Sequence, residues 1–288
     1  MGSSENTRAF FVADLHGKIP RYEKLFKAIE DEKPGAVFIG GDILPHLDPP
    51  DFSGERFMKG YFLSELEELK DKLGSEYPPI FVILGNDDGK QDEQLLIDAD
   101  EQSLVVYIHG RRVELSRWQV FGYAYVPPTP FRLKDWEKYD VSRYVDIGAV
   151  SPEEGTRSVP ADEHELKFGT IKKDLDKLTD RLDLENAIFL FHSPPYRSKL
   201  DRADLDGARI DHAPLDVHVG SIAISRFIRK RQPLLTMHGH VHESARLTGS
   251  WKEKIGRTVA LSAAHGGPEL ALVRFDIRNP AEAERELI

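Results

Sequence analysis

Five short apolar runs, each followed closely by residues able to bind a metal ion, constrain this chain more than any other feature. The runs are residues 9–13, 36–39, 80–84, 187–191 and 234–236. Runs of this length and composition are typical of buried strands. The residues that follow them are, in order, Asp14 with His16, Asp42, Asn86, His192, and His240 with His242. A helix-capping aspartate, a turn asparagine or a buried histidine would explain any single case, but five cases in one chain indicate a common cause.

The segments between the first three runs have a helical period. Pro20 suits a first helical turn, and residues 22–29 place apolar side chains on one face. Residues 62–73 repeat this pattern and end at Gly74. The alternation of strands and helices predicts parallel strands with right-handed crossovers. Functional groups in such sheets collect at the carboxyl ends of the strands, so the polar residues that follow the runs are expected to meet.

Other strands and helices are predicted outside these runs. Strands are predicted at residues 104–107, 111–115, 118–123, 259–261 and 270–275, the first three as an antiparallel meander. Thr170 and Ser221 are expected to cap helices, because apolar residues follow each of them at helical spacing. The charged tail after Asn279 is expected to lie at the surface or to fray.

Residues 127–165 contain prolines, aromatic residues and charges but little periodicity. An irregular segment of this length is usually either a functional lid or disordered. Aromatic residues favour an ordered lid or cap here; they include Phe131, Trp136, Tyr139 and Tyr144. Because the chain shows no internal repeat and no linker, we predict a single domain over residues 1–288 with this segment as its lid.

Composition excludes several classes of protein. A net charge of -10 and an isoelectric point near 5.6 do not suit general binding to nucleic acids or membrane surfaces. The absence of cysteine excludes disulfides, thiolate-bound zinc and thiol nucleophiles. No apolar run approaches the length of a membrane span and the N-terminus lacks a signal-like apolar region, so we expect a cytoplasmic protein. An acidic enzyme can still act on anions where metal ions reverse the local field.

The stretch 237–242 holds three of the eleven histidines at alternate positions. Neutral imidazole is the commonest metal ligand among side chains, and alternate residues of an extended segment share a face. We expect His240 and His242 to bind metal and His238 to support them. No role is assigned to the remaining histidines outside the motifs: His109, His164, His212 and His265.

In chain order, these motifs resemble those of the calcineurin-like metallophosphoesterases. The matching pieces are Asp14-Leu15-His16, Gly41-Asp42, Gly85-Asn86, His192 and Gly239-His240-Val241-His242. They span residues 14–242, and the stretch 192–243 is similar to the small prokaryotic, Icc-like branch. The resemblance implies an α/β fold in which two facing mixed β-sheets are flanked by helices, a four-layer α-β-β-α sandwich.

The resemblance also implies a dinuclear metal centre with Asp42 bridging two ions. One ion would be held by Asp14, His16, Asp42 and His242, and the other by Asp42, Asn86, His192 and His240. Two ions about 3.5–4 Å apart can share a bridging hydroxide that attacks phosphorus and can stabilise the developing charge. The implied activity is hydrolysis of a phosphodiester or phosphomonoester in a small phosphorylated substrate. Oxygen and nitrogen ligands without thiolate suit Mn²⁺, with iron or Zn²⁺ as alternatives.

The chain departs from the family pattern at two motifs. Asp87 stands where the family commonly has a histidine that stabilises or protonates the leaving oxygen. An aspartate near two cations is a poor acid, so it either orients a water molecule or points away, and a phosphodiester is the preferred substrate. Pro45 and His46 replace the usual acidic and arginine residues of the second motif. His46 is either a substrate contact or a surface residue.

One substrate contact and two competing functions complete these expectations. His218 precedes the Ser221 cap at a helix N-terminus, which is a natural anion site, so it is a candidate substrate contact. A metallo-β-lactamase type of hydrolase is excluded because its clustered His-x-His-x-Asp-His segment is absent. A catalytically silent scaffold that binds a protein partner remains the alternative, and it predicts eroded ligands.

Overall fold

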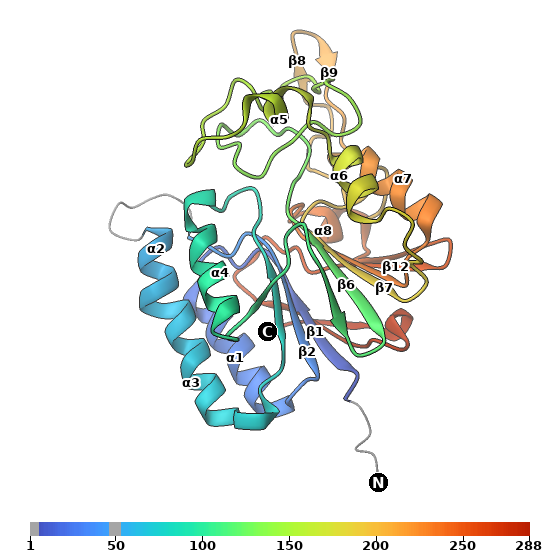
Figure 1. Ribbon diagram of the computed structural model, residues 1–288. Helices are drawn as coiled ribbons and strands as arrows, with labels where there is room; N and C mark the ends of the chain where they lie inside the picture. The colour runs from blue at the N-terminus through green and yellow to red at the C-terminus, as the bar shows by residue number, and fades with distance from the viewer. Residues whose placement is uncertain (1–5, 46–52) are drawn as a thin grey trace.

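Two six-stranded sheets that face each other form the centre of the computed structural model, which describes residues 6–45 and 53–288 (Figure 1). The first sheet has the order β14 (Glu284–Leu287), β13 (Ala271–Asp276), β1 (Arg8–Val12), β2 (Ala36–Gly40), β3 (Ile80–Ile83) and β4 (Val106–Tyr107). The second has the order β11 (Lys252–Ile255), β12 (Thr258–Ser262), β10 (Leu235–His238), β7 (Ala187–Phe191), β6 (Trp118–Tyr123) and β5 (Arg112–Leu115). In each sheet four strands run parallel and the remaining strands pair antiparallel.

Helices cover the outer faces of both sheets, which confirms the predicted four-layer α/β architecture. Those beside the first sheet are α1 (Ile19–Glu32), α2 (Gly54–Phe57), α3 (Leu63–Leu73) and α4 (Glu93–Glu101), with a π-helical stretch Met58–Phe62 between α2 and α3. Those beside the second sheet are α6 (Ile171–Leu178) and α7 (Ile222–Arg231). Two short helices, α5 (Glu163–Phe168) and α8 (Ser244–Thr248), lie in connections. No helix among the described residues combines the length and apolar character needed to cross a membrane.

Strand side chains alternate between two apolar layers. Ile188 and Leu190 of β7 pack in the core between the sheets, whereas Phe189 and Phe191 pack with α6 and α7. This is the period of two that a strand buried on both faces requires. Phe189 also stacks on Phe121 of β6, with ring centroids 4.6 Å apart. The apolar runs are therefore continuous because both faces of these strands are covered.

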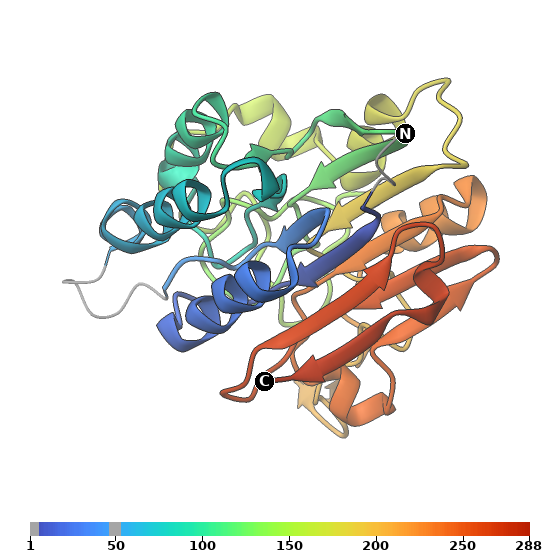
Figure 2. The same ribbon diagram turned by 90° about the horizontal axis from the view of Figure 1, so that it is seen from below.

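The structure corrects one strand prediction and decides between the two outcomes expected for the C-terminal tail. The predicted meander is wrong in part, because β4 pairs parallel with β3 in the first sheet and only β5 and β6 pair antiparallel. The chain crosses from one sheet to the other at residues 108–111, where Ile108 still donates to Val82. The charged tail lies at the surface, which was one of its two expected outcomes, and it pairs there as edge strand β14 instead of fraying. Figure 2 shows β13 and β14, in red, beside the blue β1.

Residues 127–165, the cap segment, lie above the carboxyl ends of the strands beside a small hairpin of β8 (Arg209–Ile210) and β9 (Ala213–Pro214) (Figure 1). The cap segment is ordered by buried polar contacts. Trp136 is fully buried, and the equally buried Lys134 and Glu137 form an ion pair. Both partners also bond to Thr129, which donates its backbone N–H to Glu137 at 2.7 Å.

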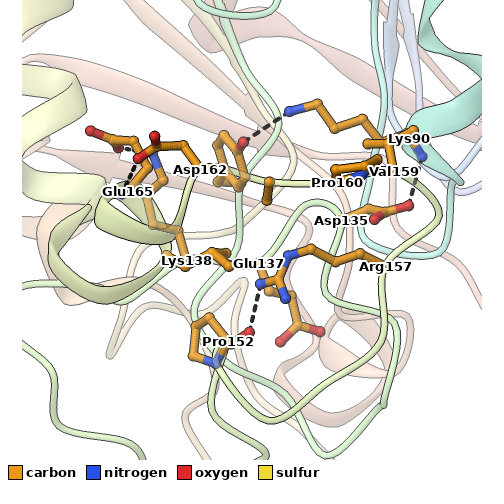
Figure 3. A pocket seen from close by; sticks show the side chains of 13 residues that line it. Lys90, Asp135, Glu137, Lys138, Pro152, Arg157, Val159, Pro160, Asp162 and Glu165 are labelled. Carbon is orange, nitrogen blue, oxygen red and sulfur yellow. Dashed lines mark hydrogen bonds and ion pairs between the residues drawn. The ribbon is translucent and has the colours of Figure 1, made fainter.

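A second set of contacts joins the cap segment to the loop after β3 (Figure 3). The backbone N–H of Lys90 donates to Asp135 at 2.8 Å, and its ammonium group donates to the Tyr125 hydroxyl at 3.3 Å. Within the cap segment itself, Arg157 donates to the Pro152 carbonyl at 2.6 Å. These side chains surround a cavity of about 270 Å³. The cap is thus tied to the first sheet as well as to its own turns.

Replacing Lys134 with methionine is expected to lower the free energy of unfolding by about 3–5 kcal/mol, because Glu137 is left buried without its cation. Urea unfolding followed by tryptophan fluorescence measures this loss, and exposed Lys177→Met is the matched control. Burial already raises the pKa of Glu137, and removing Lys134 raises it further. The folded variant then takes up a proton more readily than the unfolded chain, so its deficit should shrink between pH 7 and pH 5. An unchanged urea midpoint at pH 7 would contradict the role of the pair.

Candidate metal centre

All seven predicted ligands lie at one edge, where the carboxyl ends of strands from both sheets face each other. Asp14 and His16 follow β1, Asp42 follows β2, Asn86 follows β3, His192 follows β7, and His240 and His242 follow β10. Their ligand atoms form two overlapping groups, Asp14, His16, Asp42 and His242, and Asp42, His192 and His240. Within each group these atoms lie within 4.8 Å of one another, and Asp42 belongs to both groups.

In the first group, ligand atoms from β1, β2 and β10 converge. The Nε2 atoms of His16 and His242 lie 3.1 Å apart. Nε2 of His242 lies 3.5 Å from Asp14 Oδ1, and Nε2 of His16 lies 3.9 Å from Asp42 Oδ2. Asp14 Oδ2 is buried and has no hydrogen-bond partner among the residues that the structure describes. A buried carboxylate oxygen without a partner is costly, and a cation among these atoms would satisfy it.

The second group is centred on His192, which is fully buried. Its Nε2 lies 3.2 Å from Asp42 Oδ2 and 3.1 Å from Asn86 Oδ1. Its Nδ1 lies 2.8 Å from the Gly40 carbonyl oxygen and must donate to it. This bond leaves Nε2 as the nitrogen that can bind a metal ion. The ring of His240 packs at 5.3 Å from that of His192.

Four of the seven residues have a left-handed backbone, which presents their side chains at sharp turns. The φ angles are 56° at Asp14, 49° at His16, 51° at Asp42 and 73° at His240. Backbone bonds hold the first two turns together, since Asp14 donates to Gly41 at 3.0 Å and His16 donates to Asp42 at 2.8 Å. His240 in turn donates its N–H to Asp14 Oδ1 at 2.9 Å. Left-handed residues other than glycine are uncommon and cluster at functional sites.

Two glycines leave room for this arrangement. Gly41 has φ 92°, and a Cβ atom on it would lie 2.7 Å from His192 Nδ1. A Cβ atom on Gly85 would lie 2.3 Å from Asp42 Oδ1. Any side chain at either position would displace a ligand. The glycines that precede Asp42 and Asn86 are therefore part of the centre.

The charges of the centre attract cations. Burial raises the pKa of Asp42, but His192, His16 and the Asp87 N–H outweigh it and hold that pKa well below its usual range. Burial lowers the pKa of His192, but Asp42 and Asp14 raise it to about 10. Burial lowers the pKa of His240 to about 3, so this imidazole is neutral, as a ligand must be. Carboxylate, amide oxygen and imidazole together fit divalent metal ions.

Asp87 lies at the wall of the cavity above these ligands, so it does not point away from the site. Its backbone N–H donates to Asp42 Oδ1 at 2.9 Å, and one of its carboxylate oxygens lies 3.7 Å from His16 Nδ1. Burial and the neighbouring Asp42 raise the pKa of Asp87 to about 7. Asp87 therefore lies beside Asp42 and His16, and its action on a substrate stays a prediction.

Asp88 is a positioning residue that the sequence reasoning missed. Its buried carboxylate accepts three backbone N–H bonds, from Leu44 at 2.8 Å, Ile43 at 3.2 Å and Gly85 at 2.8 Å. These bonds join the turn after β2 to the turn after β3. The sequence did contain one signal for this role. Two aspartates follow Gly85-Asn86, and the second of them, Asp88, is available to bind backbone N–H groups of the neighbouring turns.

Arg21 is a second residue that was missed. It is buried on α1 and donates to the backbone carbonyl of Asp14. It also donates to the carbonyls of His265, at 3.2 Å, and Gly267. Arg21 thereby links the first ligand turn to the loop after β12. No spacing in the sequence distinguishes it from the exposed arginines.

Both ring nitrogens of His238 have hydrogen-bond partners within the chain. Its Nδ1 bonds to the Ser193 carbonyl at 2.9 Å and its Nε2 bonds to the Thr236 hydroxyl at 2.8 Å. The ring also stacks on Phe191 at 5.7 Å. His46 lies outside the described residues.

The anion site expected beside His218 is filled by this chain. His218 lines the cavity, and its Nδ1 lies 2.9 Å from Asp201 Oδ1. The N-terminus of α7 binds the carboxylate of Asp140, which accepts bonds from the Ser221 hydroxyl and the Ile222 N–H, both at 2.6 Å. The helix end therefore anchors the cap segment and offers no free site to a substrate anion.

A cavity of about 490 Å³ opens directly onto the ligands. Its floor includes Asp42, Asn86, His240 and His242, and its walls come from the cap segment and from residues 196–222. This volume lies within the usual range for a small-molecule site. The cap segment therefore shapes the space that a substrate bound at the ligands would occupy.

A family model described as calcineurin-like phosphoesterase matches residues 7–244. The chain belongs to this family. As a calcineurin-like phosphoesterase, it is a hydrolase of phosphoric esters, and the family implies a centre of two divalent metal ions. An uncharacterized protein of Methanocaldococcus jannaschii is 25% identical to it over 254 residues, which are 87% of this chain and 85% of that protein.

Two solved structures share the fold of this calcineurin-like phosphoesterase. The protein TT1561 of Thermus thermophilus has a TM-score of 0.53 at 17% identity, with 98% of each chain covered. A dimetal phosphatase from Danio rerio has a TM-score of 0.51 at 12% identity, with 94% of this chain and 92% of that chain covered. Both likenesses extend over nearly the whole chain.

Replacing Asp88 with asparagine is expected to destabilise the protein by about 1–3 kcal/mol, because one amide oxygen cannot accept all three backbone bonds. The two ligand turns would loosen, and the affinity for Mn²⁺ is expected to fall about ten- to hundredfold. Calorimetric titration with Mn²⁺ and urea unfolding measure the two effects. Exposed Asp71→Asn is the matched control. Unchanged Mn²⁺ affinity in a destabilised variant would limit Asp88 to a structural role.

Proposed function

We propose that this family member is a dinuclear metal-dependent phosphoesterase that prefers phosphodiesters. The observation that carries the proposal is the convergence of two ligand groups that share Asp42 at the floor of one cavity. Asp14, His16, Asp42 and His242 would hold one ion, and Asp42, Asn86, His192 and His240 the other. Mn²⁺ is the proposed metal, with iron or Zn²⁺ as alternatives. The chain forms one domain in which the cap segment acts as the lid.

Two divalent ions in this centre would supply Lewis-acid stabilisation of phosphoryl oxygens and activation of a water nucleophile. The chain's own groups fix where this chemistry takes place. Gly40 orients the His192 ring through Nδ1, and the His240 N–H orients the Asp14 carboxylate. Four positive charges against the two carboxylates of Asp14 and Asp42 leave a local excess of about two, which binds phosphate on an acidic protein.

The diester preference rests on Asp87. A histidine at this place can donate a proton or a hydrogen bond to a leaving oxygen, whereas an Asp87 carboxylate that two bound cations keep ionised can only accept. Loss of a general acid matters most for poor leaving groups, and a positioned acid typically contributes about 10²–10⁴-fold. An ester whose leaving group departs without protonation is therefore the better substrate. Asp87 remains able to orient a water molecule at the cavity wall.

Asp42→Ala and His240→Ala are each expected to lower metal-dependent hydrolysis of bis-p-nitrophenyl phosphate by more than about hundredfold, the upper range for residues that merely support a ligand. The protein is stripped of metal and reloaded with Mn²⁺, Zn²⁺ or Mg²⁺ before each assay. The control is His164→Ala, since His164 is exposed on α5. A folded wild type that binds these metals without turning over any ester would sink the activity as proposed. A folded wild type that binds no metal would favour the scaffold.

Asp87→His is expected to raise the ratio of diphenyl phosphate to bis-p-nitrophenyl phosphate turnover by about tenfold or more, because the new imidazole can protonate the poor phenolate leaving group, whereas p-nitrophenolate departs without a proton. Asp87→Asn removes the charge without supplying a general acid, so it serves as the comparison and should leave the ratio nearly unchanged. If both variants raise the ratio equally, charge repulsion rather than proton donation would explain the preference.

A further inference from the structure

We propose that the cavity accepts phosphate esters whose second group is apolar and carries no negative charge. This substrate class rests on the proposed function and deepens it. The selecting region is the apolar chamber, the part of the cavity lined by Phe131, Tyr144, Ile147, Ile210 and Leu215. It adjoins the metal ligands, so an ester bound there by its phosphate extends one group into the apolar chamber.

Exposed apolar side chains gather at this chamber. Six large apolar residues are exposed in the described part of the chain, and four of them line the cavity: Phe131 at 58%, Tyr144 at 68%, Ile147 at 49% and Ile210 at 42%. The other two, Phe168 and Leu287, do not line it. Single exposed apolar residues are ordinary, but a contiguous group of them indicates a binding surface.

The chamber is built by two segments that are far apart in the sequence. The cap segment supplies Phe131, Tyr144 and Ile147, and the β8–β9 hairpin region supplies Ile210 and Leu215. Gly148 allows their close approach, because a Cβ atom on it would lie 2.7 Å from Ile210 Cδ1. The cap segment and the hairpin region thus pack closely at Gly148, which brings their apolar side chains to the same part of the cavity.

The charges around the chamber disfavour a second anionic group. No lysine or arginine lines the cavity among the residues that the structure describes, but Asp146, Asp216 and Glu243 do. Asp216 is held in place, since it accepts bonds from the Tyr196 hydroxyl at 2.6 Å and from the His218 N–H at 2.9 Å. A polyphosphate or carboxylate in the substrate's second group would meet these fixed negative charges.

Two sources of positive charge that lie close by are not available to a substrate. The N-terminus of α7 binds Asp140, as described above. The cations Lys90, Lys138 and Arg157 line the separate cavity of about 270 Å³ (Figure 3). Inside the main cavity, the proposed metal centre is therefore the only strong anion attractant among the described residues. One phosphate is bound there, and the rest of the substrate is selected by apolar contact.

A series of p-nitrophenyl phosphodiesters tests this selection. The second alcohol is methyl, hexyl or benzyl, with 3-aminopropyl and 2-carboxyethyl as a charged pair. We expect kcat/KM to rise about ten- to hundredfold from methyl to hexyl or benzyl, as partial burial of the added carbons implies. The carboxyethyl ester should be the poorest of the series. Equal kcat/KM across the series, or a preference for the carboxyethyl ester, would overturn the substrate class while leaving the phosphodiesterase intact.

Substitutions inside and outside the apolar chamber test whether this chamber selects the second group of the ester. Phe131→Ser with Ile147→Ser should reduce the hexyl-to-methyl ratio about tenfold. Phe168→Ser, which changes an exposed phenylalanine outside the cavity, should leave the ratio unchanged. Asp146→Asn should improve the carboxyethyl ester relative to the aminopropyl ester, and Asp211→Asn, outside the cavity lining, should not. Ratios that do not respond to the chamber variants would contradict the assignment.

Binding of the neutral apolar dye N-phenyl-1-naphthylamine provides a readout that needs no catalysis. Its fluorescence should rise with wild type and with Phe168→Ser, and rise far less with the Phe131→Ser, Ile147→Ser variant. No turnover of any ester with any metal would overturn the proposed function, and the ester assignment with it, even if the dye binds. Turnover with equal dye binding by all variants would overturn the chamber alone.

Discussion

The structure depends on holding two carboxylates and four imidazoles together at the edge where two sheets face each other. Four of the ligand residues adopt a left-handed backbone, which costs about 1–3 kcal/mol for each residue. The turns keep this geometry because β1, β2, β7 and β10 are buried on both faces and bonded to their neighbours. Asp88 and Arg21 then join the turns to one another. The left-handed turns thus lie at the ends of strands that are buried on both faces.

The same edge explains how an acidic protein can act on anions. Asp14 and Asp42 are buried beside histidines, and their charges favour cations at one place. The surrounding cavity adds further carboxylates and no described lysine or arginine. If the proposed ions are bound, anion binding in this cavity would depend on them. The net charge of -10 is compatible with phosphate binding at the proposed metal ions, because such binding does not require a basic surface.

The proposed ligands were predictable because each follows an apolar run. A strand that is buried on both faces can be recognised from its own apolar sequence, without knowing which strands it pairs with. The sequence did not predict which sheet each strand joins. β4 and β5 are close in sequence, yet they lie in different sheets. β14 is charged and was expected at the surface or frayed, yet it pairs with β13, as edge strands can carry charge. The helix N-terminus after Ser221 was expected to offer a substrate anion site, but a carboxylate of this chain occupies it. Its occupant, Asp140, lies 81 residues away and has no local signal.

Asp140 also determines how specificity is divided in this molecule. Its carboxylate stabilises the first turn of α7 and fixes the cap segment over the cavity. With the helix end filled, the cap contributes apolar wall and carboxylates to the cavity but no anion site. On the proposed function, the strand ends would determine which bond is attacked, and the cap segment would determine which groups the phosphate can carry. We therefore expect that changes in the cap segment can alter the substrate while the proposed ligands stay in place, because the described anchors of the cap are Lys90 and the first turn of α7 and not the ligand residues.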